Sequence, residues 1–397
     1  MLNEKMRDLG ARRSVIRELF EYGKKRKAEI GAENVFDFSI GNPSVPAPDA
    51  VGETLKRLLE EKDPVSLHGY TSAQGDAGVR RAIAEYVTKT EGAATDPDLI
   101  YLTVGAAASL TVTLTAVLNA GDEVILLAPF FPEYRVFVER TGAVVVPVLC
   151  DTKTFQPDLA ALEAAITEKT RAIIVNSPNN PTGAVLTEES AKGLCDLLTA
   201  CEKKYGSDIY LIADEPYREL VYGEVKVPYL PNYYDNTVVC YSFSKSVSLP
   251  GERIGYILVS PKAHEPVSLY QAVCGAGRAL GFVCAPALFQ YMIPSILGMT
   301  SDLSVYDTNR KLLYDALVSY GYEPVKPDGA FYLFVKALEE DANAFCERAK
   351  DFELLLVASD SFGCPGFVRI SYCVTTEQIE RSLPAFQKLA ESYGIKR

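Results

Sequence analysis

Side chains of different chemistry follow one another in a short order through the middle of the chain. An amide, a carboxylate, a phenol, an amine and a guanidinium occur there as Asn180, Asp214, Tyr217, Lys245 and Arg253. A lysine amine can form a Schiff base with an aldehyde. A carboxylate beside a pyridine nitrogen would keep that nitrogen protonated, so that the ring withdraws electrons. The set therefore predicts a site for a phosphorylated pyridine aldehyde.

The elements that would position these residues are short apolar runs, which predict buried strands at residues 124–127, 143–146, 172–175, 210–213 and 238–241. Amphipathic segments of helical length, at 158–169 and 188–205, separate some of the runs. This is the pattern of an α/β protein with a mostly parallel central sheet flanked by helices. Ligands bind beyond the carboxyl ends of such strands. Because Asn180, Asp214 and Lys245 each follow a run, strand order alone could bring them to one edge.

The chain changes character after about residue 286. A long helical stretch at 302–320 is followed by apolar segments at 330–334 and 366–371. These segments predict a second, smaller α+β unit. We therefore expect a large cofactor-binding domain at 50–285 and a small domain at 286–397.

Length and composition limit the function classes. The chain has 397 residues, of which 48% are hydrophobic and 23% charged, as in ordinary soluble proteins. Its net charge of -12 leaves no basic surplus to neutralise phosphates, so we expect no nucleic-acid partner. The first residues are charged and amphipathic rather than signal-like, and no apolar segment is long enough to span a membrane, which predicts a cytoplasmic protein. With only His68 and His264, no histidine-based metal site is expected.

Together these motifs resemble the class I/II aminotransferases, pyridoxal phosphate enzymes of the aspartate aminotransferase fold type. The most specific piece is the lysine motif at 242–246 with its continuation at 249–255, and the similarity runs from residues 40–43 to 369–371. The resemblance implies a homodimer with shared active sites at the subunit boundary. It also implies a small domain built from both chain ends, so that residues 1–49 would join it.

The resemblance assigns the catalytic roles to Lys245, Asp214 and Tyr217. Lys245 would form the Schiff base and then carry a proton between the substrate and the cofactor. Asp214 would face the pyridine nitrogen, and both Tyr217 and Asn180 would reach the ring oxygen O3′. Phe131 would stack on the pyridine ring.

The same resemblance places the cofactor phosphate at a helix start. The side chains of Ser242 and Arg253 would bind it, together with the backbone of Gly105, Ala106 and Ala107. Tyr70 would reach this phosphate from the neighbouring subunit.

For the substrate, Arg369 would bind the α-carboxylate through two parallel hydrogen bonds, beside Asn180 and the backbone of Gly41. A dicarboxylate needs a second cation, and the alanines at 106–108 leave none in the phosphate turn. Arg278, presented by a partner subunit, and Arg17 are the two candidates.

The predicted reaction is a ping-pong transamination between an L-amino acid, aspartate or a broad range, and a 2-oxo acid such as 2-oxoglutarate. A pyridoxal phosphate-dependent β C–S lyase would use the same residues and remains the alternative. A ligand-sensing regulator is disfavoured because the chain begins with family-like helix. A dinucleotide-dependent dehydrogenase is disfavoured because no GxGxxG follows the early strands.

Overall fold

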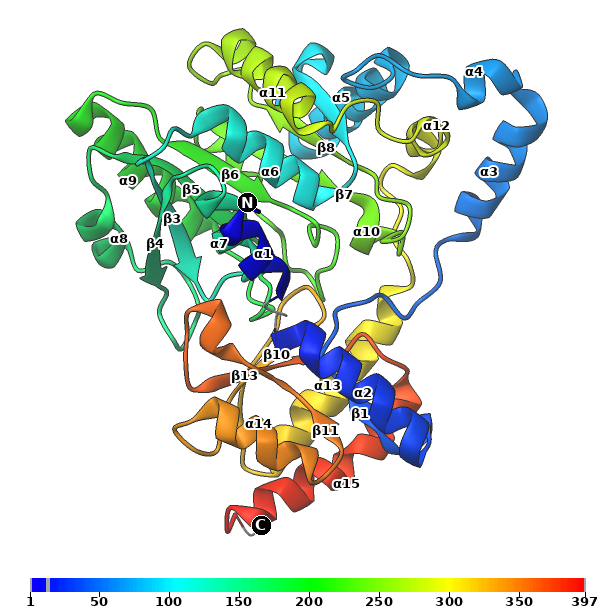
Figure 1. Cartoon of the computed structure of the whole chain (residues 1–397), viewed down its shortest axis with the longest axis vertical. Coiled ribbons are helices and arrows are strands. Elements are labelled where there is room, and N and C mark those ends of the chain that lie inside the picture. The colour runs from blue at the N-terminus through cyan, green and yellow to red at the C-terminus, as the bar shows by residue number, and fades with distance from the viewer. Residues whose placement is uncertain (1, 12–14, 396–397) are drawn as a thin grey trace.

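The computed structural model describes residues 2–11 and 15–395. Residues 1, 396 and 397, at the outer ends of the two predicted terminal segments, lie outside the described residues, as do residues 12–14. Within the described part, a large α/β unit stands above a smaller unit that contains the C-terminal part of the chain (Figure 1). No helix in the described part of the chain is long and apolar enough to cross a lipid bilayer.

The large unit is built on a seven-stranded sheet. Its order is β2 (Ile100–Thr103), β8 (Gly255–Val259), β7 (Thr237–Ser242), β6 (Tyr210–Asp214), β5 (Thr170–Asn176), β3 (Glu123–Ala128) and β4 (Val144–Leu149). The strands from β7 to β4 pair in parallel, and β8 pairs antiparallel with both of its neighbours. The predicted mostly parallel sheet is confirmed, and β2 and β8 are strands that the apolar runs did not indicate.

Helices cover both faces of this sheet because successive strand side chains point to opposite sides. One core contains Ile173 and Leu211 and packs against α5 (Ala77–Glu91), α8 (Leu159–Ala165), α9 (Glu188–Tyr205) and α12 (Ala287–Ile296). The other contains Ile174 and Ile212 and packs against α6 (Ala106–Val117), α7 (Glu133–Glu139) and α11 (Pro266–Leu280). α12 also packs against α3 (Asp49–Glu61), which α4 (Pro64–His68) follows. The domain boundary near residue 286 stays a prediction.

Helix ends follow local chemistry, and α9 shows this most clearly. The Thr187 side chain accepts a hydrogen bond from the Ser190 backbone N–H and so caps the first turn. Gly206 ends the helix with φ 66°, a left-handed conformation that glycine adopts without a side-chain clash. The helix has the bounds that the sequence predicts.

The smaller unit contains a four-stranded antiparallel sheet in the order β12 (Val357–Ala358), β13 (Phe367–Ser371), β10 (Tyr332–Lys336) and β9 (Glu323–Val325). Its helices are α13 (Leu303–Ser319), α14 (Ala342–Lys350) and α15 (Thr376–Ser392). The N-terminal strand β1 (Phe36–Asp37) pairs in parallel with β11 (Leu354–Leu355), and α2 (Val15–Ile30) packs nearby through Leu19 (Figure 1). Segments from both chain ends therefore meet here.

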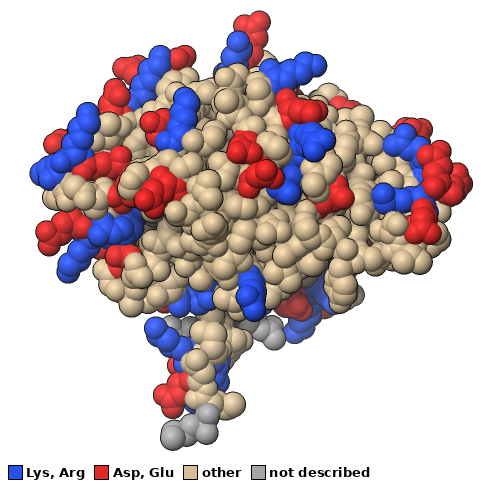
Figure 2. Space-filling view, turned by 90° about the horizontal axis from the view of Figure 1, so that it is seen from above, with Lys and Arg blue, Asp and Glu red and all other residues tan. Residues whose placement is uncertain are grey.

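The remaining described elements are short. They are α1 (Glu4–Ala11), α10 (Phe243–Ser246) and four 3-10 turns at Ala32–Asn34, Pro97–Leu99, Leu230–Asn232 and Ser359–Phe362. α1 has no buried residue. The face in Figure 2 carries basic and acidic side chains interspersed, with no broad area of one sign.

Candidate active site

Parallel strands end at one edge of the large sheet, and polar residues stand at their ends. β5 ends at Asn176, β6 at Asp214 and β7 at Ser242, and α10 then carries Lys245. A cavity of about 530 Å³ opens at this edge, and Asn180, Asp214 and Lys245 all line it. This volume is typical of a small-molecule site. The order of the strands therefore brings together residues that lie far apart in the sequence.

The charges around this cavity oppose those of the whole chain. Among the described residues that line it, the cations are Arg17, Lys245, Arg253 and Arg369, whereas Asp214 is the one carboxylate. The chain as a whole has a net charge of -12. A cavity rich in cations within an acidic protein favours an anionic ligand.

Asp214 is buried with one oxygen bound and the other open. Its side chain is 5% exposed, and the Tyr134 hydroxyl donates a short hydrogen bond to Oδ2. Oδ1 is buried and has no hydrogen-bond partner among the described residues. Burial raises the pKa of the Asp214 carboxyl to about 7. A buried acceptor without a partner is costly, so Oδ1 points to a donor that a ligand supplies.

Asn176 connects two of these residues from the end of β5. Its Nδ2 donates to the backbone oxygen of Asp214 at 2.9 Å, and its Oδ1 accepts from the backbone N–H of Asn180 at 2.8 Å. One amide side chain thus fixes the end of β6 and the turn that carries Asn180.

Burial of Asp214 predicts a pH-dependent stability. Because its folded-state pKa is raised, the folded state holds the proton more tightly, and stability is lost as pH rises from about 4 through 7. We expect Asp214→Asn in the ligand-free protein to be more stable than the wild type at pH 8, by on the order of 2–4 kcal/mol, with little difference at pH 4. Urea unfolding at the two pH values measures this. Asp196→Asn, on the exposed side of α9, is the control, and parallel pH profiles for Asp214→Asn and wild type would contradict the prediction.

Lys245 is partly buried and shares the cavity with two arginines. Burial lowers the pKa of its ammonium group to about 8, and the positive charges of Arg253 and Arg369 act in the same direction. Its Nζ donates to the backbone oxygen of Gly41 at 2.6 Å. The lowered pKa gives a larger fraction of neutral, nucleophilic amine near neutral pH than an ordinary lysine has.

Arg369 is a buried cation without a carboxylate partner. It is 2% exposed, and no acidic side chain forms an ion pair with it in the described part of the chain. Its guanidinium donates to Asn180 Oδ1 at 3.1 Å and to the Ser39 backbone oxygen at 2.5 Å, whereas Nε has no partner among the described residues. Burial lowers the pKa of the guanidinium, which shows how poorly the site solvates this charge. Such a group favours binding of an anion.

Two tyrosines, Tyr217 and Tyr332, are in contact in the cavity wall near Arg369. The hydroxyls of Tyr217 and Tyr332 lie 2.8 Å apart, and burial raises the pKa of both phenols. The Tyr332 ring also lies against the Arg369 guanidinium, with 4.8 Å between the ring centroid and Cζ. Sequence reasoning identified Tyr217 and Arg369 but missed Tyr332, and it also missed Tyr134.

The start of α6 also lines the cavity and offers groups that favour an anion. α6 begins at Ala106, and the first N–H groups of a helix have no partner within the helix. Gly105 has φ 92°, and a side chain there would come within 2.7 Å of the Arg253 guanidinium. Ser242 and Ser244 line the same cavity.

Other predicted residues fall in different places. Phe131 and Gly41 line the cavity, as does Arg17 on α2. Tyr70 is 98% exposed, and Arg278 lies exposed on α11. Neither is among the described residues that line the cavity of this single chain.

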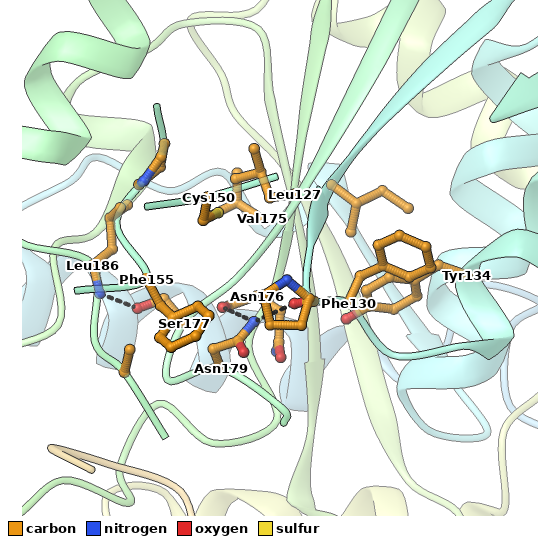
Figure 3. A pocket seen from close by; sticks show the side chains of 14 residues that line it. Leu127, Phe130, Tyr134, Cys150, Phe155, Val175, Asn176, Ser177, Asn179 and Leu186 are labelled. Carbon is orange, nitrogen blue, oxygen red and sulfur yellow. Dashed lines mark hydrogen bonds between the residues drawn. The ribbon is translucent and has the colours of Figure 1, made fainter. Parts of the chain in front are cut away.

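A second, smaller cavity of about 40 Å³ is shown in Figure 3. Tyr134 and Asn176 line both cavities. Asn179 is turned toward the backbone oxygen of Asn176, to which it donates at 3.4 Å, and Ser177 accepts from the backbone N–H of Leu186 at 2.9 Å (Figure 3). This space can hold a water molecule, but no charged side chain of the described residues lines it. The reactive groups belong to the larger cavity.

Comparison with solved structures defines the fold as that of aspartate aminotransferase. The structure superposes on an amino transferase from Eubacterium rectale with a TM-score of 0.97 at 58% identity, over 99% of both chains. It superposes on the aspartate aminotransferase from Thermus thermophilus with maleate with a TM-score of 0.85 at 27% identity, covering 96% of this chain and 98% of that one.

Sequence comparison gives the family. The family described as aminotransferase class I and II matches residues 33–386. An aspartate aminotransferase from Thermotoga maritima is 31% identical over 95% of this chain and 97% of its own length. An aromatic-amino-acid aminotransferase from Thermococcus litoralis is 29% identical over 95% of each chain. The chain belongs to the class I and II aminotransferases, an enzyme family that typically uses pyridoxal phosphate.

Proposed function

We propose that this aminotransferase binds pyridoxal phosphate in the 530 Å³ cavity and moves the amino group of an L-amino acid to a 2-oxo acid such as 2-oxoglutarate. The proposal rests on one observation, that a reactive amine and a buried guanidinium line the same cavity. Lys245 presents an amine whose pKa is lowered to about 8, and Arg369 presents a buried cation without a carboxylate partner among the described residues. An amine and an anion site side by side suit an α-amino acid.

The residues present fit the cofactor at both of its ends. Asp214 Oδ1 is buried without a partner among the described residues, and it would accept a hydrogen bond from the N–H of the protonated pyridine ring. The start of α6, Ser242 and Arg253 would hold the dianionic phosphate. Once bound, pyridoxal phosphate supplies an aldehyde for amines and a ring that withdraws electrons. The expectation that Phe131 stacks on the ring agrees with its place in the cavity lining.

Lys245 would act first as a nucleophile and then as a base. Its neutral amine would condense with the cofactor aldehyde, with release of one water. After a substrate amine takes its place and frees it, the amine would move a proton at the substrate Cα. The hydrogen bond from Nζ to the Gly41 backbone oxygen, 2.6 Å long, holds the amine at the substrate side of the cavity. A pKa near 8 lets this amine take and return a proton close to neutral pH.

Arg369 and Asn180 would position the substrate. The guanidinium would bind the α-carboxylate, and its bond to Asn180 Oδ1 at 3.1 Å keeps it turned toward the cavity. The Asn180 amide nitrogen would then face the cofactor ring oxygen, together with the Tyr217 phenol. The backbone of Gly41 lines the same side, where it would contact the carboxylate.

We also propose a homodimer in which the partner completes the site. Tyr70, proposed to reach the phosphate, is 98% exposed in this chain, so its ring gains a contact only from a second molecule. The apolar side chains of Leu2, Met6 and Leu9 on or beside α1 are between 47% and 80% exposed, which is unusual for a free surface. Sedimentation at twice the mass of one chain tests this, and a monomer at micromolar concentration contradicts it.

The fate of the nitrogen separates this function from the β C–S lyase. With 15N-labelled amino donor and an unlabelled 2-oxo acid, we expect the label in the newly formed amino acid, in equal amount to the donor consumed. Release of the label as ammonium, with pyruvate formed from cysteine or cystathionine, would instead establish the lyase. Omission of the 2-oxo acid should limit turnover to one donor per active site.

We further propose that aspartate is one of the amino donors and that a positively charged side chain binds its distal carboxylate. Relatives named for aspartate and for aromatic amino acids are both similar to this chain. Arg17 lines the cavity beside the apolar residues Ile16 and Phe20, a lining that also suits a larger side chain. Arg278 would have to come from the partner subunit.

We expect Arg17→Ala or Arg278→Ala to reduce kcat/KM for aspartate by roughly tenfold to a hundredfold, because one charged hydrogen bond contributes about 1.5–3 kcal/mol. The same variants should turn over phenylalanine within about threefold of wild type, since that substrate has no distal charge. Steady-state rates with both donors measure this. If both variants leave aspartate turnover intact, neither arginine binds the distal carboxylate.

A further inference from the structure

Tyr332 occupies a position between the groups proposed to bind cofactor and substrate. It begins β10, pairs with Ser371 of β13 and is 2% exposed. Arg369 lies two residues before Ser371 on the same strand and therefore on the same face of the sheet as Tyr332. We propose that Tyr332 is a positioning residue of this site, whose hydroxyl orients the Tyr217 phenol and whose ring holds the Arg369 guanidinium. This inference rests on the proposed function.

In the hydrogen bond between the two tyrosine hydroxyls, donation from Tyr332 to Tyr217 suits the proposed role of Tyr217. A phenol carries one proton, so if Tyr217 donates to the cofactor ring oxygen, the proton between the two hydroxyls, 2.8 Å apart, must come from Tyr332. Burial raises the pKa of the Tyr332 phenol to about 12, and the nearby Arg369 charge partly offsets this. Burial raises the pKa of Tyr217 well above its ordinary value, although the Arg369 charge lowers that pKa as well. The more acidic phenol is the better donor. Accepting its proton makes Tyr217 a stronger donor in turn.

The same hydroxyl fills the space beside Gly41. A side-chain carbon at residue 41 would lie 2.0 Å from the Tyr332 oxygen, so any larger residue there would displace the Tyr332 hydroxyl. The Gly41 backbone oxygen accepts from Lys245 at 2.6 Å. Tyr332 is thus packed against the turn that holds the amine as well as against the phenol.

The ring has a separate task. The Arg369 guanidinium lies against two aromatic rings, at 4.8 Å from the Tyr332 centroid and 5.3 Å from the Phe362 centroid. Aromatic faces attract a desolvated cation and limit its movement. Since no described carboxylate holds Arg369, these rings and its two hydrogen bonds fix its direction.

Two substitutions separate the tasks. Tyr332→Phe removes the hydroxyl and keeps the ring, whereas Tyr332→Leu removes both. The control is Tyr372→Phe, because Tyr372 is fully buried in the same unit, and its hydroxyl lies 3.2 Å from both the Tyr222 hydroxyl and the Ala330 backbone oxygen, to one of which it donates. It does not line the cavity. A general effect of losing a buried hydroxyl would therefore appear in the control as well.

The first readout is the pH midpoint of the visible absorbance of the bound cofactor, measured without substrate. Donation to the ring oxygen draws electrons from the nitrogen that joins Lys245 to the cofactor and so lowers its basicity. We expect Tyr332→Phe to raise this midpoint by roughly half to one pH unit, the equivalent of one ordinary hydrogen bond. Tyr372→Phe should leave it within about 0.2 units.

The second readout is the Kd of maleate, an unreactive dicarboxylate, followed by the same absorbance. We expect Tyr332→Phe to bind maleate within about twofold of wild type and Tyr332→Leu to bind it about three to ten times more weakly, in line with the loss of one cation–π contact.

An unchanged pH midpoint in Tyr332→Phe, or an equal shift in Tyr372→Phe, would show that the Tyr332 hydroxyl does not orient Tyr217. Unchanged maleate binding in Tyr332→Leu would overturn the ring task. A wild-type protein without any cofactor absorbance would instead refute the proposed function. Should the leucine variant misfold, Tyr332→Phe decides alone, because no midpoint shift there refutes the positioning role.

Discussion

Replacement of Lys245 by alanine is expected to lower the rate of amino transfer by about four orders of magnitude or more. No other lysine of the described residues lines the cavity, so no second amine is placed to attach to the cofactor or to move the substrate proton. General acid–base catalysis by a positioned side chain contributes roughly 10²–10⁴-fold, and loss of the nucleophile adds to that. Single-turnover rates with a saturating amino donor measure the effect.

Two variants show whether the amine itself is responsible. Lys245→Arg keeps a positive charge in the cavity but lacks a nucleophilic amine, so it should be as inactive as Lys245→Ala. Lys192→Ala removes an exposed lysine on α9 that pairs with Glu188, and it should retain full activity. Activity of Lys245→Ala within tenfold of wild type would contradict the assignment of Lys245.

Arg369→Lys is expected to reduce kcat/KM for every amino donor by about 10²–10⁴-fold. A guanidinium can make two parallel bonds to a carboxylate, each contributing about 1.5–3 kcal/mol, whereas an ammonium acts as a point charge. The lysine would also lose the bond to Asn180 and the packing against Tyr332 and Phe362. Steady-state rates with aspartate, phenylalanine and alanine measure the loss, which should be similar for all three because all share the α-carboxylate.

The matched control is Arg310→Lys. Arg310 also lies against a tyrosine, with 4.6 Å between Cζ and the Tyr222 centroid, but it pairs with Asp307 at 2.6 Å and does not line the cavity. We expect this variant to keep kcat/KM within about threefold of wild type, since an ion pair of this kind affects stability by roughly 1 kcal/mol. A loss in Arg310→Lys equal to that in Arg369→Lys would mean that the effect is structural.

Apolar runs predicted five strands of the large sheet and the edge where Asp214 and Lys245 lie, because buried parallel strands are continuous apolar segments followed by functional loops. The same reasoning missed β2 and β8. β8 (Gly255–Val259) pairs antiparallel with its neighbours, and only the four-residue helix α10 (Phe243–Ser246) separates it from β7, so the strand–helix–strand pattern of the parallel strands is absent here.

Sequence motifs do not identify residues whose roles depend on contacts with residues far away in the sequence. Tyr134 bonds to Asp214 across 80 residues, and Tyr332 bonds to Tyr217 across 115 residues. Nothing near either tyrosine in the sequence distinguishes it from a core aromatic, because its role arises only when distant parts of the chain pack together. Tyr134 meets Asp214 within the large unit, whereas Tyr332 comes from β10 of the smaller unit. The burial of Arg369 without a described carboxylate is likewise a property of the fold. The roles proposed for Tyr70 and Arg278 require a second chain, and the structure of one chain does not test them.

Attachment of the cofactor to Lys245 in this cavity can be measured directly by mapping the modified residue. Reduction of the cofactor-saturated protein with sodium borohydride, digestion and mass spectrometry should place one pyridoxyl phosphate group on the peptide that contains Lys245. Prior addition of an amino donor without a 2-oxo acid should remove that label, because the cofactor then carries the amino group and is no longer bound to the lysine. A label on another lysine, or no label in the saturated wild-type protein, would contradict the account.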